Sequence, residues 1–222
     1  MHTNLNKLEF IHNKINEIIN KKQLKTKPKI IVVTKTFSIE NIIPLLESGH
    51  LHYGENKIQE AENKWGQIRK NYKNLQLHMI GKLQSNKAKK AVDLFDYIHS
   101  LDSEKLAIKI SQYQKELKKD VKLFIQLNLA EEKQKSGIEI NNLKTFYNYC
   151  VNDLSLNVIG LMCLPPIGSN SDKYFNLLKK NSEDLNLKEL SMGMSSDYES
   201  AIINSSTFLR LGTLIMGKRN VT

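Results

Sequence analysis

Strand-like and helix-like segments alternate about eight times along this chain, and this alternation restricts the possible folds more than any other feature. Each apolar, β-branched run is followed by a segment whose apolar residues recur at helical spacing. The alternation favours parallel strands joined by right-handed crossovers. The expected strands lie at residues 30–35, 52–56, 75–81, 97–101, 123–129, 158–164, 189–192 and 208–211.

Eight parallel strands can close into a barrel. The 222 residues supply about 28 for each unit, enough for a strand, a helix and two short loops. We therefore predict an α/β fold, a single (β/α)8 barrel domain over residues 1–222, with an amphipathic leading helix within residues 1–27 that Pro28 ends. An open doubly wound sheet is the alternative, but no GxGxxG fingerprint follows the first strand.

Composition narrows the class of protein further. The sequence has no apolar run near about 18 residues and no signal-peptide pattern, so we expect a soluble, cytoplasmic protein without a membrane span. Cys150 and Cys163 have no CxxC spacing and are expected to be reduced packing residues. The net charge of +10 predicts a general attraction to phosphorylated ligands. Nucleic-acid binding is the alternative, although the lysines are spread out and form no stripe.

In a barrel, residues far apart in sequence converge on the rim where the strands end. Lys35 ends the first predicted strand, and desolvation there would lower its amine pKa and make it a Schiff-base nucleophile. An ordinary surface lysine is the alternative interpretation. No cluster of His, Asp or Glu has the spacing of metal ligands, so we predict no metal site. The other rim candidates are Asn56, Lys82, Gln84, Asn128, Cys163, Met194, Ser195, Arg210, Gly212 and Thr213.

The loops after the last two predicted strands carry small polar residues. The run 193–196 is expected to open a helix, and Ser196 to Glu199 has the form of a capping box. The start of a helix suits a phosphate, although Ser196 as a simple cap is the alternative. Gly212 and Thr213 add amides and a hydroxyl. Together with Lys35 at the first strand, these loops suit a ligand with an aldehyde at one end and a phosphate at the other. Ser38 and Ser85 are expected to cap two earlier helices.

Six motifs, in order along nearly the whole chain, resemble those of the pyridoxal phosphate homeostasis family. They are Val33-Thr34-Lys35-Thr36, His52-Tyr53-Gly54-Glu55-Asn56, His78-Met79-Ile80-Gly81-Lys82-Leu83-Gln84-Ser85-Asn86-Lys87, Lys135-Ser136-Gly137, Leu190-Ser191-Met192-Gly193-Met194-Ser195 and Arg210-Leu211-Gly212-Thr213. The resemblance implies a barrel like the N-terminal part of bacterial alanine racemase, with pyridoxal 5′-phosphate as the cofactor. The sequence departs from the family pattern at Thr34, Ser205 and Met216, which affects packing more than the ligand set.

The resemblance also implies a role for each site residue. Lys35 resembles the Schiff-base lysine, and Arg210 the arginine facing the pyridine nitrogen. A guanidinium is always a donor, so it disfavours protonation of that nitrogen and restrains carbanion chemistry. The remaining implied cofactor-binding residues are Ser195, Gly212 and Thr213 for the phosphate, Met194 for the wall of the phosphate loop and Asn56 near the ring.

For function, the resemblance implies a carrier that buffers or delivers the cofactor, with PLP-dependent apo-enzymes as recipients, as a monomer or weak homodimer. A racemase of this type needs a tyrosine from an additional β-domain, and this chain ends soon after its last predicted strand. The alternative is a small PLP-dependent racemase or lyase that takes its missing acid from a partner chain. His52, His78 and His99 are expected to be structural, as is Trp65; Lys82, Lys87 and Lys135 are solvated charges or a basic rim.

Overall fold

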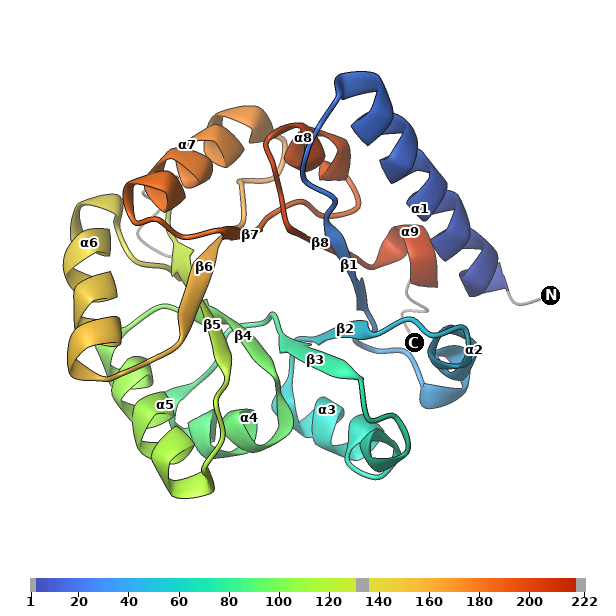
Figure 1. Ribbon diagram of the computed structural model, residues 1–222. Coiled ribbons are helices and arrows are strands. Elements are labelled where there is room, and N and C mark those ends of the chain that lie inside the picture. Colours follow the sequence, from blue (N-terminus) through green and yellow to red (C-terminus); the bar gives the residue numbers. More distant parts are fainter. Residues whose placement is uncertain (1–2, 131–135, 219–222) are drawn as a thin grey trace.

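The computed structural model describes residues 3–130 and 136–218, and its eight parallel strands form one closed barrel in chain order (Figure 1). The barrel prediction is confirmed, and the open-sheet alternative is wrong because β1 pairs with both β2 and β8. The strands are β1 Lys29–Val33, β2 His52–Glu55, β3 Gln76–Met79, β4 Tyr97–Leu101, β5 Lys122–Leu127, β6 Val158–Cys163, β7 Glu189–Ser191 and β8 Phe208–Leu211.

Helices cover the outside of the barrel (Figure 1). Short 3-10 helices, η1 Ile39–Asn41, η2 Ile68–Asn71 and η3 Ser85–Lys87, interrupt three of the connections, and a π-helical turn, η4 Tyr149–Asp153, extends α6. The α-helices are α1 Thr3–Lys22, α2 Ile43–Glu47, α3 Ile58–Trp65, α4 Ala88–Leu94, α5 Glu104–Leu117, α6 Ile140–Asn148, α7 Ser171–Asp184, α8 Tyr198–Ile203 and α9 Thr213–Met216.

The core has two parts because strand side chains alternate between the two faces of the barrel wall. The larger part fills the space between the wall and the helices, where Trp65 is fully buried, as expected. The smaller part lies inside the barrel and consists of Ile31, Tyr97, Phe124, Met162 and Phe208. Unlike the aliphatic filling common in such barrels, this interior is largely aromatic.

The leading helix lies against α8 and α9, so it covers the seam where β8 meets β1 (Figure 1). Its buried residues Leu8, Ile11 and Ile15 follow the predicted helical spacing. The helix ends at Lys22, where Gln23 turns into the left-handed region with φ of 52°. The expectation that Pro28 ends it is therefore wrong, because the chain leaves the helix several residues earlier.

Two predicted helix caps are wrong. Ser38 precedes a 3-10 helix and accepts a hydrogen bond from the Asn41 side chain at 3.0 Å, with no capping bond to a backbone N–H. Ser85 lies within the 3-10 helix Ser85–Lys87, and α4 begins only at Ala88. In both places the tighter turn shifts the start of the α-helix by a few residues.

Cys150 and Cys163 are buried free thiols, as predicted, and burial raises the pKa of each to about 12.

Between residues 3 and 218, apart from the undescribed 131–135, no helix is long and apolar enough to cross a membrane.

Candidate functional site

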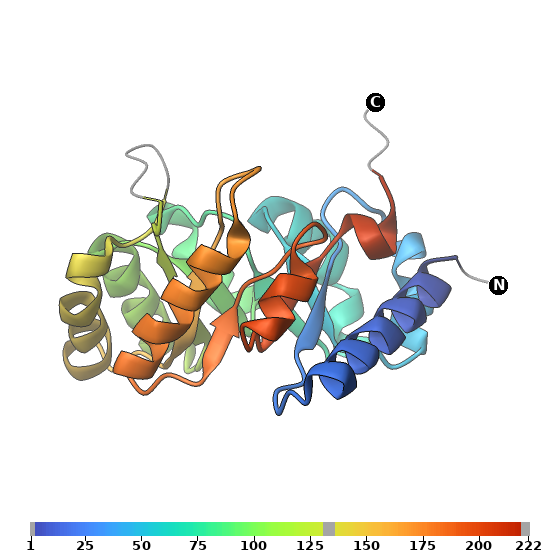
Figure 2. The same cartoon turned by 90° about the horizontal axis from the view of Figure 1, so that it is seen from above.

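The carboxyl ends of the strands meet on one side of the barrel, the upper side in Figure 2, together with α9 and the loop after β6. Lys35 follows β1 on this side and is half-buried. Ile31 faces the barrel interior, so the alternation of the strand carries Lys35 to the same inner side and Thr34 to the outer side. The backbone therefore places Lys35 at the mouth of the barrel.

The residue before Lys35 is tied to α3 by a buried polar cluster. The Thr34 hydroxyl donates to Glu55 Oε1 at 2.7 Å, and the Lys64 ammonium donates to the Thr34 carbonyl oxygen at 2.7 Å. Lys64 also binds Glu55 Oε1 at 2.8 Å, and the Trp65 indole donates to the same oxygen at 2.9 Å. Thr34 is thus fixed through both its side chain and its backbone.

The residue after Lys35 is held by the same helix. The backbone N–H of Thr36 donates to Glu60 Oε1, which also accepts from Lys64 at 3.1 Å. Thr36 has φ of 69°, a left-handed conformation that costs a β-branched residue free energy unless its surroundings enforce it. With anchors on both sides, the backbone at Lys35 is held in position before any ligand arrives.

The two loops that were predicted to bind phosphate lie side by side. The Leu214 N–H donates to Ser195 Oγ at 3.4 Å, so the loop after β7 lies beside Gly212 and Thr213 at the end of β8. Gly193 has φ of 91°, and a Cβ there would lie 2.5 Å from the Cβ of Ala201, so only glycine fits this turn.

The predicted capping box at Ser196 is wrong. Helix α8 begins at Tyr198, and Asp197 occupies the cap position. The Asp197 carboxylate instead accepts the backbone N–H of Met194 at 2.6 Å, so this amide is already engaged within the loop. Ser195 carries a hydroxyl on the loop after β7, and Thr213 carries one at the end of β8. Met194, next to Ser195 in the chain, is half-buried.

Arg210 is almost completely buried near the end of β8. Its guanidinium donates from Nη1 to Ser191 Oγ at 2.7 Å and from Nη2 to the Cys163 carbonyl oxygen at 3.0 Å. Burial lowers the pKa of Arg210, whereas Cys163 and Asp197 act in the opposite direction. The two bonds fix the plane of the guanidinium, and three further N–H groups remain for other partners.

Three histidines also lie in the barrel interior, beneath Arg210. Each was predicted to be structural, but the sequence did not predict that they form one hydrogen-bonded series. His52 Nδ1 lies 2.9 Å from His78 Nε2, His78 Nδ1 lies 2.9 Å from His99 Nε2, and His99 Nδ1 lies 2.8 Å from Ser191 Oγ. Each of these residues occupies an inward-facing position of its strand. The alternation of inward and outward positions along each strand is the sequence feature that could have shown that they face the same interior. We call His52, His78, His99 and Ser191 the histidine column.

Burial lowers the pKa of every histidine in the column. The pKa of His52 falls to about 4 through burial and the nearby Lys29 and Lys122, and those of His78 and His99 lie well below their ordinary value. His50, beside the column, is also lowered to about 4 by burial. At neutral pH these imidazoles are therefore uncharged.

We expect stability to fall with acidification between about pH 6.5 and pH 4. In the unfolded chain these histidines take up protons near pH 6.5, whereas the folded pKa of His50 and His52 is about 4, so protons favour unfolding. The slope reaches up to about 1.4 kcal/mol per pH unit for each blocked histidine. Urea denaturation at pH 7 and pH 5 measures it, and an equal unfolding free energy at both would contradict the prediction.

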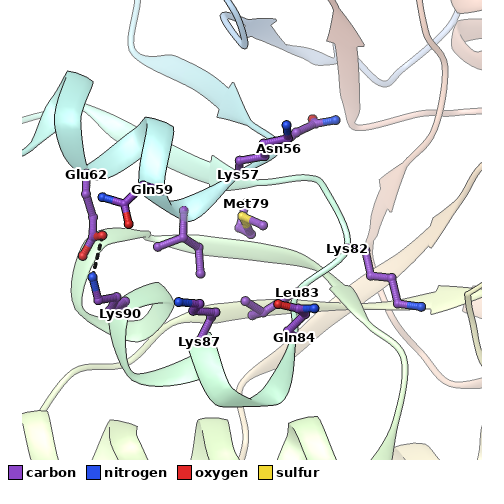
Figure 3. Close-up of a pocket in the computed structure, with 11 residues that line it drawn as sticks. Asn56, Lys57, Gln59, Glu62, Met79, Lys82, Leu83, Gln84, Lys87 and Lys90 are labelled. Carbon is purple, nitrogen blue, oxygen red and sulfur yellow. Dashed lines mark hydrogen bonds and ion pairs between the residues drawn. The ribbon is translucent and has the colours of Figure 1, made fainter.

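A basic cavity of about 290 Å³ lies beside the mouth, between the starts of α3 and α4 (Figure 3). Lys57, Lys82 and Lys87 line it, and Lys90 is paired with Glu62 at 2.8 Å. Asn56 also lines this cavity, whereas Lys35 and Arg210 do not. Lys82 and Lys87, expected as solvated charges or a basic rim, both line this cavity, and Lys135 lies outside the described residues.

The predicted site residues follow four neighbouring strands, β7, β8, β1 and β2, whose carboxyl ends lie on the same side of the barrel. Asn56, which follows β2, also lines the basic cavity. Its carbonyl oxygen would lie 2.3 Å from a Cβ at residue 81, so Gly81 lets the two loops approach closely. Within the described ranges, no group of three or more His, Cys, Asp or Glu side chains could hold a metal ion.

The closed parallel barrel places this chain in the class of the alanine racemase N-terminal domain, whose family model matches residues 8–220. An alanine racemase from Clostridium difficile shares the fold, with a TM-score of 0.66 at 13% identity over 94% of this chain and 57% of that chain. Within this class, the chain belongs to the pyridoxal phosphate homeostasis protein family.

Relatives of that name match most of the chain. The Synechocystis sp. protein is 38% identical over 200 residues, covering 86% of this chain and 91% of its own length. The Aquifex aeolicus protein is 35% identical over 202 residues, covering 86% of this chain and 87% of its own length. PipY of Synechococcus elongatus, solved with PLP bound, has a TM-score of 0.80 at 32% identity, covering 91% of this chain and all of that chain.

Proposed function

We propose that this chain binds pyridoxal 5′-phosphate at the barrel mouth, holds it as a Schiff base on Lys35, and serves intracellular PLP homeostasis by buffering or delivering the cofactor without turnover of its own. The shared name of the relatives and the PLP-bound PipY structure support this proposal. The observation that carries it is the arrangement of one anchored lysine, one buried arginine and a pair of hydroxyl-bearing loops at the same end of the barrel.

The donors present fit the chemical groups of this cofactor. The aldehyde of pyridoxal phosphate condenses with a primary amine, with loss of water, and its ring then withdraws electrons from the attached carbon. Lys35 supplies the amine from a backbone that Thr34 and Thr36 hold to α3. Ser195 and Thr213 supply hydroxyls, and Gly212 a backbone amide, for the phosphate.

Arg210 suits the ring nitrogen of the cofactor. A guanidinium offers only donors, so the nitrogen facing it acts as an acceptor and stays unprotonated. Such a ring is a weaker electron sink, which favours storage of the cofactor over carbanion chemistry. Asn56, on the loop after β2, and Met194, beside Ser195, complete the proposed binding set.

Two measurements test this function directly. Equilibrium dialysis of the purified protein with PLP should show saturable binding and an absorbance band near the edge of the visible range. Incubation of the loaded protein with L-alanine should form D-alanine no faster than free PLP does. Turnover above that background would overturn the carrier proposal, and absence of saturable binding would overturn the cofactor assignment.

We expect Ser195→Ala and Thr213→Ala each to weaken PLP retention by about 1–3 kcal/mol, roughly 5-fold to 150-fold, the usual effect of removing a hydrogen bond to a charged group. Dialysis at fixed ionic strength measures the change in dissociation constant. Thr145→Ala, on the exposed side of α6, is the matched control and should retain the cofactor as the parent chain does. Equal affinities in all four proteins would remove these hydroxyls from the proposed phosphate site.

The recipients we propose are PLP-dependent apo-enzymes, which would approach the mouth across the basic cavity of Lys57, Lys82 and Lys87. We further propose that residues 1–222 act as one domain, in the cytoplasm, as a monomer or weak homodimer. Size-exclusion chromatography with light scattering, over a range of protein concentrations, measures the oligomeric state.

A further inference from the structure

The histidine column joins one end of the barrel interior to the other. It runs through inward positions of β2, β3 and β4 and then crosses to Ser191 on β7, which contacts Arg210 on β8. His78 stacks on Tyr97 with ring centroids 4.2 Å apart, and His99 stacks on Phe124 at 4.3 Å. The stacked rings hold each imidazole in a fixed plane, so the hydrogen bonds have one available geometry.

Charges at both ends oppose an extra proton in this column. Arg210 lies at the mouth end, while Lys29 and Lys122, the first residues of β1 and β5, lie at the floor near His52. Their ammonium groups sit over the rings of Phe208 and Tyr97 at 4.7 Å and 4.9 Å. Tyr97, which stacks on His78, and His50 are further titratable groups close to the column, and burial keeps His50 neutral as well. A relay that passes through imidazolium is therefore disfavoured.

The direction of the hydrogen bonds follows from Arg210. A guanidinium can only donate, so Ser191 Oγ must accept from it, and the Ser191 hydroxyl hydrogen is then available for His99 Nδ1. With Nδ1 accepting, His99 carries its hydrogen on Nε2 and donates to His78 Nδ1. His78 in turn donates from Nε2 to His52 Nδ1. In the opposite direction Ser191 would accept two hydrogen bonds and need a further acceptor.

The same chain of bonds acts back on Arg210. A hydroxyl that donates to one partner becomes a stronger acceptor for another, so the bond from His99 strengthens the Ser191–Arg210 bond. If the guanidinium rotated away, the buried Ser191 oxygen would lose its donor, which disfavours that rotation. Among the described residues, Ser191 and the Cys163 carbonyl oxygen accept hydrogen bonds from the guanidinium and hold it in place.

We propose that His52, His78, His99 and Ser191 are positioning residues for Arg210, a column of neutral imidazoles all carrying the Nε2–H tautomer and pointing their donors from the mouth to the floor. The proposal rests on the proposed function only where it concerns the cofactor: Arg210 would then be held in place against the ring nitrogen by residues that never touch the ring.

Histidine side-chain nitrogen NMR on the full chain without added cofactor tests the tautomers directly. We expect Nε2–H signals for His52, His78 and His99, unchanged between pH 8 and pH 6.5. An Nδ1–H tautomer or an imidazolium at any of the three at pH 7 would overturn the column. Because this measurement needs no PLP, it decides the proposal even if the cofactor assignment fails.

Matched substitutions test the link to Arg210. Ser191→Ala should mix the tautomers of His99 and weaken PLP retention about tenfold with a shifted absorbance band, and Ser191→Thr, which keeps the hydroxyl, should restore all three. At the floor, His52→Leu should shift the band, whereas His52→Asn keeps an acceptor in place of Nδ1 and should not. Circular dichroism checks that the Ser191→Ala and His52→Leu variants are folded. If both variants are folded and keep the histidine tautomers and the absorbance band of the parent protein, the positioning role is overturned.

Discussion

Replacing Lys35 with alanine is expected to abolish the covalent adduct that borohydride traps from the PLP-loaded protein. In the adduct proposed for the parent chain, the Lys35 amine is joined to the aldehyde carbon by a carbon–nitrogen double bond, with loss of water, and borohydride would reduce that bond so that the cofactor stays attached. Alanine has no amine, while the anchors of the neighbouring backbone, Thr34 to Lys64 and Thr36 to Glu60, do not involve the side chain at 35. The barrel should therefore fold as before.

Mass spectrometry of peptides after reduction measures the site of attachment. Lys82→Ala is the matched control, since Lys82 lies near the mouth and lines the basic cavity, and this variant should label at Lys35 as the parent does. A label of equal intensity on Lys35→Ala, or one that maps to another lysine in the parent chain, would contradict the assignment.

Glu55→Ala is expected to lower the free energy of unfolding by about 3–5 kcal/mol, the usual effect of removing one member of a buried ion pair. Glu55 is fully buried and its Oε1 accepts from Thr34, Lys64 and Trp65. The substitution leaves the buried ammonium of Lys64 and the indole N–H without this acceptor. Because Thr34 precedes Lys35, we also expect weaker PLP retention in this variant.

Guanidinium denaturation measures the change, and two variants serve as controls. Glu116→Ala removes an exposed ion pair with Lys89 and should change the unfolding free energy by less than about 1 kcal/mol. Glu55→Gln keeps an oxygen acceptor and should lose less than Glu55→Ala. A loss below 1 kcal/mol in Glu55→Ala would show that the cluster contributes little to stability.

Strands β1, β5 and β6 could be predicted from the sequence because each is a short, mostly apolar run. Strands β4 and β8 were predicted with their observed bounds. Helix starts were harder. Ser38, Ser85 and Ser196 all have the residue type of a cap, yet 3-10 turns at the first two and the Asp197 carboxylate at the third changed the local geometry. A residue of this type favours the cap position, and the neighbouring backbone and side-chain groups decide whether it is used there.

Local order along the chain was therefore enough to predict the eightfold alternation and the strand ends that the rim candidates follow, since each depends on spacing between near neighbours. Only the tertiary structure decided how Lys35 is anchored through α3, and that His52, His78 and His99 form one column beneath Arg210. Those contacts join residues 21 to 92 positions apart in the chain, and hydrogen bonds at such separations depend on the register and closure of the barrel, which no local pattern encodes.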